Sequence, residues 1–282
     1  MGFLWLFARR FVAGETLEAA LLKIKEINDK GLLTTVDILG ESITERADAE
    51  SYRDNYINLL RVADREGLDG NISIKPTMMG LDIDDEFCYA NVKRLLEEAD
   101  KLGSFVRIDM EGSPHTDRTL ELLYRLRRDH DNVGIVVQAM LRRTAEDIRL
   151  LNERGVSVRL CKGAYKEPKE IAFKRMRQIR ENFKELTKTL LRDGTYPAIA
   201  THDGGLIRWT KEWAAEQGIG KDSFEFQMLY GLRGRTQVEL AREGYKMRVY
   251  VPYGTEWFPY FYRRLRERKE NVFFIAKTFF KP

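Results

Sequence analysis

Short apolar runs alternate with long amphipathic stretches along most of the chain. Each run is rich in β-branched and aromatic residues and is bounded by Gly, Pro, Asn or Asp, which is typical of buried strands. The stretches between them place apolar residues three to four positions apart, which is typical of surface helices. The runs predict strands at 32–39, 71–75, 104–110, 133–140, 156–162, 197–202, 224–229 and 245–251. The stretches predict helices at 84–101, 116–129, 144–154, 167–192, 205–217, 235–243 and 260–270.

This alternation predicts the fold class. Strands that alternate with helices pair in parallel through right-handed crossovers, and eight repeats in about 250 residues match a closed barrel. The competing architecture is an open doubly wound sheet, whose dinucleotide-binding form carries a GxGxxG turn after the first strand. Residues 37–42 read Asp-Ile-Leu-Gly-Glu-Ser instead. We therefore expect an α/β fold, a (β/α)8 TIM-like barrel in a single domain over 1–282, with residues 1–31 as an N-terminal helical extension and a C-terminal helix over the barrel mouth.

Composition and charge narrow the class of protein. Hydrophobic residues at 43% and charged residues at 33% are typical of a soluble globular chain, and no stretch approaches the ~20 apolar residues that span a bilayer. The 48 basic and 44 acidic residues are interspersed, which disfavours nucleic-acid binding. Two distant cysteines, Cys88 and Cys161, and three scattered histidines disfavour a disulfide framework and a metal centre. We expect a cytoplasmic protein. The apolar segment 3–7 favours a helix that packs its apolar face on the domain. A peripheral contact of this segment with the inner face of the membrane, or an oligomer formed through it, remains open.

Polar side chains stand at or near the predicted carboxyl end of every strand. In a barrel, this end and the loops after it build the active site. Any one of these residues could be a solvated loop residue or a core hydrogen-bonding group, so the inference rests on their clustering. A ring of charge facing one mouth is costly to bury unless it is paired or holds a ligand. The set is Asp37, Lys75, Asp109, Gln138, Arg159, Lys162, His202, Gln227 and Tyr250.

The last predicted helix adds a cationic face. It carries a tyrosine, two arginines and a glutamate at i, i+3, i+4 and i+7, namely Tyr260, Arg263, Arg264 and Glu267. Two adjacent arginines aimed at a cavity form a fork for a carboxylate or a phosphate. The alternative is a solvated face with an Arg–Glu pair. The aromatic residues around this face favour packing onto the barrel.

A lysine and two small residues follow the fifth predicted strand. Gly163 and Ala164 would let backbone N–H groups approach a bulky ligand closely, and Lys162 before them suits a phosphate or pyrophosphate. Gly163 could equally mark the start of a helix.

With these residues in place, the chain resembles the proline dehydrogenase family of flavin-dependent barrel enzymes. The resemblance runs from about residue 10 to the C-terminus. It implies FAD held non-covalently at the barrel mouth, L-proline as substrate, Δ1-pyrroline-5-carboxylate as product and a membrane quinone as electron acceptor. The segments that carry it are FVAGE at 11–15, IKP at 74–76, VRIDME at 106–111, VRLCKGAY at 158–165, ATHD at 200–203, FEFQMLYG at 224–231 and the helix at 260–267.

The resemblance also implies roles for individual residues. Lys75, Arg263 and Arg264 would hold the substrate carboxylate, and Glu267 would steady the arginine pair. Tyr250 and Tyr260 would line the ring pocket. Asp109 and Arg159 would lie nearest the chemistry, with Arg159 reaching the flavin N5 region. The other cofactor contacts would be Met110, Gln138, Lys162, Gly163, Ala164, Thr201, His202 and Gln227.

Two other functions remain open from the sequence. A Schiff-base aldolase or lyase on the same barrel would use Lys75 or Lys162 as nucleophile, and the double arginine would then bind a substrate phosphate. A binding scaffold without catalysis would use the aromatic terminal segments.

Overall fold

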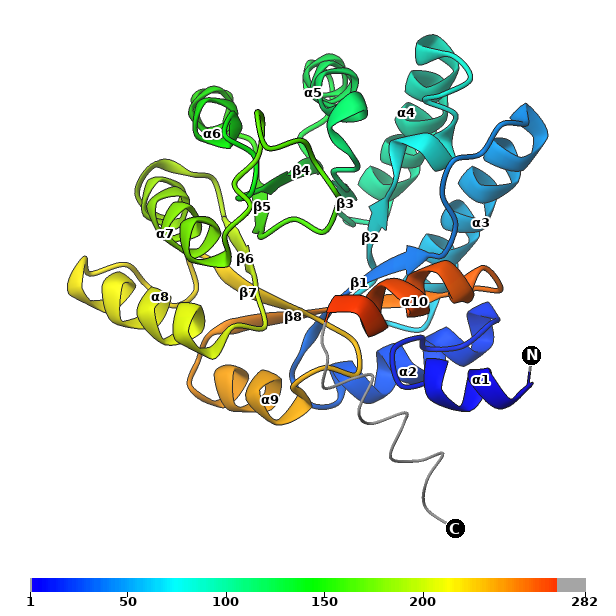
Figure 1. Cartoon of the computed structure of the whole chain (residues 1–282). Coiled ribbons are helices and arrows are strands. Elements are labelled where there is room, and N and C mark those ends of the chain that lie inside the picture. Colours follow the sequence, from blue (N-terminus) through cyan, green and yellow to red (C-terminus); the bar gives the residue numbers. More distant parts are fainter. Residues whose placement is uncertain (1, 268–282) are drawn as a thin grey trace.

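The computed structural model describes residues 2–267, and its strands close into a parallel barrel. Each strand pairs in parallel with the next, and β8 returns to pair with β1, where Thr35 lies opposite Tyr250. Figure 1 shows the strands at the centre of a ring of helices. The predicted fold class is confirmed. The strands are β1 (Leu33–Ile38), β2 (Asn71–Ile74), β3 (Val106–Ile108), β4 (Val133–Gln138), β5 (Val158–Cys161), β6 (Ala198–Ala200), β7 (Glu225–Leu229) and β8 (Lys246–Tyr253).

The helices cover the outside of the barrel because their apolar stripes pack on the strands. One helix before β1 packs against both β1 and β8, and so fills the outer position between the last strand and the first. The helix that follows β8 therefore does not occupy this outer position. The helices are α1 (Gly2–Ala8), α2 (Leu17–Asn28), α3 (Arg46–Arg65), the 3₁₀ helix η1 (Pro76–Met79), α4 (Asp85–Lys101), α5 (Ser113–Leu126), α6 (Thr144–Glu153), α7 (Met176–Asp193), α8 (Gly204–Glu216), α9 (Gly234–Arg242) and α10 (Trp257–Glu267). The helix between β1 and β8 is α2.

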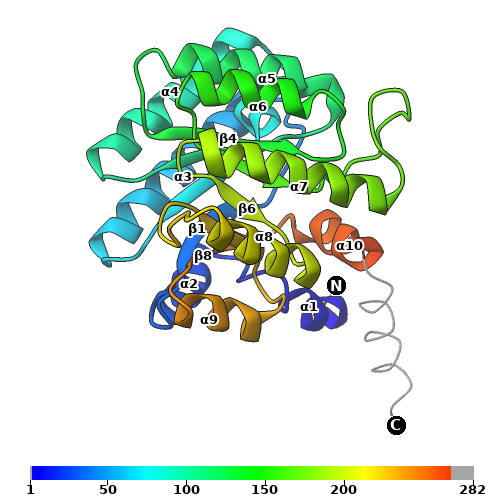
Figure 2. The same cartoon turned by 90° about the vertical axis from the view of Figure 1, so that its left-hand side faces the viewer.

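The last helix, α10, lies at the carboxyl-terminal end of the barrel. Its apolar face joins a buried cluster that includes Leu39, directly after β1, and Leu232, just after β7. Figures 1 and 2 both place α10 next to α1, and the Trp5 and Trp257 rings lie 5.3 Å apart. The indole of Trp257 also donates a hydrogen bond to Glu15 at 2.9 Å. The helix predicted over the barrel mouth is thus found there.

The helices of the structure differ from the predictions at several places, and α5, for example, lies three residues before the predicted 116–129. Residues 46–65 form α3, which the sequence reading missed because the only buried side chains in its first half are Ala49 and Arg53. Residues 167–175 do not continue α7; this loop is fixed by backbone bonds such as Phe173 N–H to the Met140 carbonyl at 2.8 Å. Helix α10 begins at Trp257 rather than 260, and residues 268–270 lie outside the described part.

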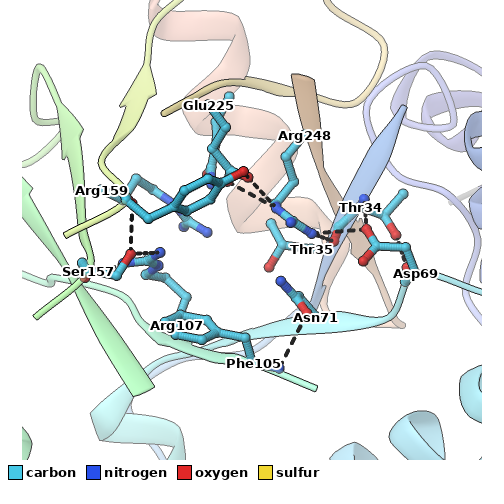
Figure 3. Close-up of polar contacts among 12 residues, drawn as sticks. Thr34, Thr35, Asp69, Asn71, Phe105, Arg107, Ser157, Arg159, Glu225 and Arg248 are labelled. Atoms are coloured by element: carbon cyan, nitrogen blue, oxygen red, sulfur yellow. Dashed lines mark hydrogen bonds and ion pairs between the residues drawn. The ribbon is translucent and has the colours of Figure 1, made fainter. Parts of the chain in front are cut away.

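Buried ion pairs lie at the amino-terminal end of the barrel. Arg248 donates from Nε to Glu225 at 3.0 Å and from Nη1 to Asp69 at 2.9 Å, and all three side chains appear in Figure 3. The same Nη1 donates to the carbonyl of Thr34 at the start of β1. These paired charges close this end of the barrel, which leaves the opposite end for a ligand.

Candidate active site at the barrel mouth

One carboxylate joins three strands at the mouth. Asp109, directly after β3, accepts a hydrogen bond from Arg159 of β5 at 2.9 Å and another from the Tyr250 hydroxyl of β8 at 2.8 Å. The guanidinium carbon of Arg159 also lies 5.4 Å from the centre of the Tyr250 ring. Burial, reinforced by Asp109, raises the pKa of Tyr250 well above its ordinary value, so its hydroxyl stays protonated and donates. Three side chains from three strands therefore hold one another in a fixed geometry.

A buried ion pair stands beside this cluster. Lys75, directly after β2, donates to Asp37 of β1 at 2.6 Å, and both side chains are almost fully buried. Burial disfavours the charged amine, but the Asp37 and Asp109 carboxylates outweigh it and raise the pKa of Lys75. The lysine is therefore a fixed cation that can attract a substrate carboxylate.

The two arginines of α10 make different contacts. Arg263 reaches across to the loop after β1, where its Nη1 donates to both oxygens of Glu41 at 2.9 and 2.8 Å. Burial opposes its charge, but Glu41 raises the pKa of Arg263. The guanidinium of Arg264 lies over the Tyr260 ring, 5.1 Å from its centre. Tyr260 itself is buried in the α1–α10 cluster, and the side chain of Glu267 lies outside the described residues.

Lys162 forms an ion pair with a second carboxylate at the mouth. Asp203, the N-cap of α8, accepts from Lys162 and from Arg180 of α7, each at 2.7 Å. Burial opposes the charged carboxylate, but these two cations lower the pKa of Asp203 well below its usual range. Next to Lys162, Gly163 has a φ of +101°, and a Cβ there would lie 2.6 Å from Met140. The left-handed φ favours glycine, and any side chain at this position would have to displace Met140.

The remaining predicted cofactor contacts lie around the same mouth. Gln138, the last residue of β4, donates to the Glu111 carbonyl at 2.9 Å. His202 accepts from the backbone N–H of Leu229 at 2.9 Å through Nε2, which fixes its ring. Gln227 lies deeper, inside β7, where its amide donates to Glu225. The other members are Met110, directly after Asp109 and buried, Ala164 in the loop after Gly163, and Thr201, whose hydroxyl accepts from the Asp203 N–H at 3.1 Å.

Sequence reasoning missed several polar residues that shape the site. Glu41 was not expected to pair with Arg263, although an acidic residue in the loop after the first strand was a signal. Asp203 stood in the quoted ATHD segment without a role. Ser73, which accepts a hydrogen bond from Arg159 at 2.9 Å, left no signal because a small hydroxyl in a strand is common.

Comparison with known proteins decides the family. A sequence profile described as proline dehydrogenase matches residues 20–277. The chain is 42% identical to proline dehydrogenase 1 of Bacillus subtilis subsp. natto, over 97% of this chain and 91% of that relative. It is 36% identical to proline dehydrogenase of Deinococcus radiodurans, over 99% of this chain and 91% of the relative. The chain belongs to the proline dehydrogenase family.

A solved structure of the family shares the fold. Proline utilization A from Bdellovibrio bacteriovorus, inactivated by N-propargylglycine, superposes with a TM-score of 0.86 at 27% identity. The match covers 92% of this chain and 32% of that much longer one. The family resemblance read from the sequence motifs is confirmed, and with it an oxidoreductase of proline catabolism rather than a lysine aldolase.

Two polar atoms, one near the mouth and one deeper inside the barrel, suit a flavin cofactor. Arg159 Nε and Gln227 Oε1 are buried and have no hydrogen-bond partner among the described residues. A buried polar atom without a partner costs about 1–3 kcal/mol, so such atoms are expected where a polar ligand completes the site. Together with the glycine backbone at Gly163, they fit a ligand that carries ring heteroatoms and phosphates.

Proposed function

We propose that the protein oxidises L-proline to Δ1-pyrroline-5-carboxylate with FAD bound non-covalently at the barrel mouth, and that a quinone takes up the electrons. The observation that carries this proposal is the joined cluster of Asp109, Arg159 and Tyr250 beside the fixed cation Lys75, in a chain of the proline dehydrogenase family. Lys75 and Arg159 are buried, Asp109 and Tyr250 are half-buried, and all four are held by hydrogen bonds or ion pairs, so the site is formed before the substrate arrives.

Cations around the mouth hold the substrate carboxylate. Lys75 supplies a buried charge from β2, while Arg263 and Arg264 supply two from α10. Among the described residues, the hydrogen bonds of Arg263 to Glu41 use only Nη1, which leaves its other N–H groups for a ligand. Charge-assisted hydrogen bonds contribute about 1.5–3 kcal/mol each, which is enough to orient a small zwitterion. Tyr250 and Tyr260 then limit where the pyrrolidine ring lies, and Glu267 would steady the arginine pair.

Residues on the other strands hold the cofactor. Arg159 would face the flavin N5 region with its unpartnered Nε, and Gln138, Thr201 and His202 would contact the ring system. Lys162, Gly163 and Ala164 suit the pyrophosphate, since a cation and exposed backbone N–H groups stabilise phosphate oxygens. Met110 and Gln227 complete the proposed contacts.

The protein contributes geometry and charge to the reaction. When bound, FAD supplies the acceptor for the hydride that leaves the carbon next to the ring nitrogen. Arg159 holds a positive charge beside the group that becomes more negative, and Asp109 keeps that arginine in place. Misplacing the substrate by about 1 Å could cost ~100-fold in rate, which is why rigid ion pairs matter here.

Electron transfer to a quinone would occur near a membrane. Among the described helices, none is both long and apolar enough to cross one. The neighbouring helices α1 and α10 do expose large apolar side chains, namely Leu4, Leu6, Phe258 and Tyr262. This surface, with Arg9 and Arg10 beside it, suits peripheral contact with an anionic cytoplasmic leaflet.

Steady-state oxidation tests the proposal. Protein loaded with FAD should convert L-proline with a soluble quinone analogue, and the product should be trapped by o-aminobenzaldehyde as the coloured adduct that pyrroline-carboxylates form. Acid precipitation should release all of the flavin, since it is held without a covalent bond. Protein that binds FAD but fails to oxidise proline would overturn the substrate assignment.

The lysine-nucleophile alternative conflicts with the site. An amine that attacks a carbonyl needs a lowered pKa, whereas the ion pair with Asp37 raises that of Lys75. Lys162 is likewise engaged by Asp203. Borohydride treatment in the presence of substrate should therefore leave no lysine adduct.

A further inference from the structure

Arg159 is held from the interior of the barrel as well as from the mouth. Its Nη1 donates to Asp109, and its Nη2 donates at 2.9 Å to Ser73 Oγ of β2, which lies across the barrel from β5. The two hydrogen bonds thus hold the two terminal nitrogens of the guanidinium. Its third nitrogen, Nε, is buried without a partner among the described residues. Fixing both Nη atoms thus fixes the direction in which Nε points.

Ser73 is itself fixed by its surroundings. Its side chain is fully buried, with 0% exposure, and its Oγ lies 3.0 Å from Thr35 Oγ1 of β1. The backbone carbonyl of Ser73 accepts a hydrogen bond from the buried hydroxyl of Tyr56 at 2.8 Å, and that hydroxyl accepts from the Ile38 N–H at 3.0 Å. Hydrogen bonds therefore fix both the side chain and the backbone of Ser73.

Donor and acceptor counting gives the bond directions. A guanidinium can only donate, so Ser73 Oγ accepts from Arg159. Ser73 Oγ also shares a hydrogen bond with Thr35 Oγ1, in which either hydroxyl can donate. In this chain both Nη groups of Arg159 and both hydroxyl oxygens have a partner, and only Arg159 Nε is left for a ligand.

We infer that Ser73, supported by Thr35, is a positioning residue that aims Arg159 at the flavin. This inference rests on the proposed function, since it assigns Arg159 to the cofactor. Ser73 does not touch the reacting atoms; it acts through the arginine. Without it, Arg159 keeps its bond to Asp109 and its place near the Tyr250 ring but loses the bond that fixes Nη2. The guanidinium can then rotate, and its charge is less well placed.

The barrel contains a matched control. Ser157, just before β5, accepts from Nη2 of another buried arginine, Arg107, at 3.0 Å, and donates to the Tyr196 carbonyl at 3.0 Å. Figure 3 shows Ser157 and Arg107 together near the labelled Arg159. Ser157→Ala removes the same kind of serine–arginine bond two residues from Arg159 without touching it.

The test compares Ser73→Ala with Ser157→Ala in the FAD-loaded protein. We expect Ser73→Ala to slow flavin reduction by proline about tenfold, the equivalent of one hydrogen bond to a charged group, with a change in KM below about twofold. The midpoint potential of bound FAD should move to a more negative value. Thr35→Val should shift it in the same direction by less. Ser157→Ala should lower the melting temperature and leave the potential at its wild-type value.

The outcomes distinguish failure of the Ser73 inference from failure of the proposed function. If Ser73→Ala and Ser157→Ala both lose stability while the potential stays at the wild-type value, Ser73 is only structural and the inference fails. If wild-type protein binds no FAD, the proposed function fails first. Should Ser73→Ala not fold, Ser73→Cys keeps the volume but replaces the oxygen with a weak acceptor, and it must show the same shift in potential.

Discussion

Arg263 of α10 donates to both carboxylate oxygens of Glu41, at 2.9 and 2.8 Å, and so joins the last helix to the loop after β1 across the mouth. The two side chains are about one-third exposed, at 32% and 36%. An ion pair this exposed contributes less than about 1 kcal/mol to folding. Its importance therefore lies in where it holds the arginine.

Glu41→Gln should weaken proline binding more than it weakens the fold. The amide keeps the shape but loses the charge that orients Arg263, so we expect KM for proline to rise severalfold. The free energy of unfolding should change by less than about 1 kcal/mol. Steady-state kinetics and urea titration measure the two effects. A lower KM would instead show that Glu41 competes with the substrate carboxylate.

Arg264→Met should remove one substrate contact and spare the cofactor. Methionine keeps most of the volume over the Tyr260 ring but carries no charge. Loss of a charge-assisted bond predicts a higher KM for proline and a fall in kcat/KM of about tenfold or more. The flavin absorbance of the purified variant should equal that of the wild type. Near wild-type kinetics would refute the carboxylate role.

Asp203→Asn should change how stability depends on pH. Hydrogen bonds from Lys162 and Arg180 hold the pKa of Asp203 below its unfolded value despite burial, so the folded carboxylate binds fewer protons than the unfolded one in acid. Its contribution is present at neutral pH and is lost as the pH falls below about 5 towards the lowered pKa. Asparagine remains a good N-cap for α8, so the substitution removes mainly the charge.

Urea titrations at several pH values check this prediction. The wild type should exceed Asp203→Asn by about 1–2 kcal/mol at pH 7, because Arg180 is half exposed and its bond is partly screened. The gap should narrow as the pH falls below about 4 and close only below the lowered pKa of Asp203. A gap that is constant with pH would mean that the carboxylate charge contributes nothing.

Gly163→Ala should damage both folding and FAD binding. The residue has a φ of +101°, and a Cβ would meet the buried Met140 at 2.6 Å. Gly103→Ala is the matched control, since Gly103 has a φ of +61° with open space around a Cβ. The control should cost about 1–2 kcal/mol from left-handed strain alone. Gly163→Ala should cost more and raise the FAD dissociation constant, and equal effects of the two would remove the cofactor role of Gly163.

The sequence predicted the barrel because each strand and most helices carry their own local pattern. Seven of the eight strands lie inside the predicted runs, and β8 extends past its run to Tyr253. Helix α3 was missed because its polar first half buries little. Local pattern also failed at 167–175, where bonds to distant residues fix a loop that reads as helix.

The site residues were predictable by position, but their pairings were not. The rule that strand ends meet at one mouth selected Asp37, Lys75, Asp109 and Arg159. Which carboxylate pairs with which cation depends on side-chain reach across the barrel, as the bond from Arg159 to Ser73 shows. Such contacts join residues far apart in the chain and leave no mark on local periodicity.

An absorbance spectrum recorded without oxygen, before and after addition of L-proline, tests the central claim most directly. Protein loaded with FAD should show flavin absorbance bands, and these bands should bleach when L-proline is added. Addition of a substrate of lysine aldolases should leave the bands unchanged. Bands that persist in saturating proline would contradict the account, because they would mean that the cations of the mouth do not hold proline against a flavin.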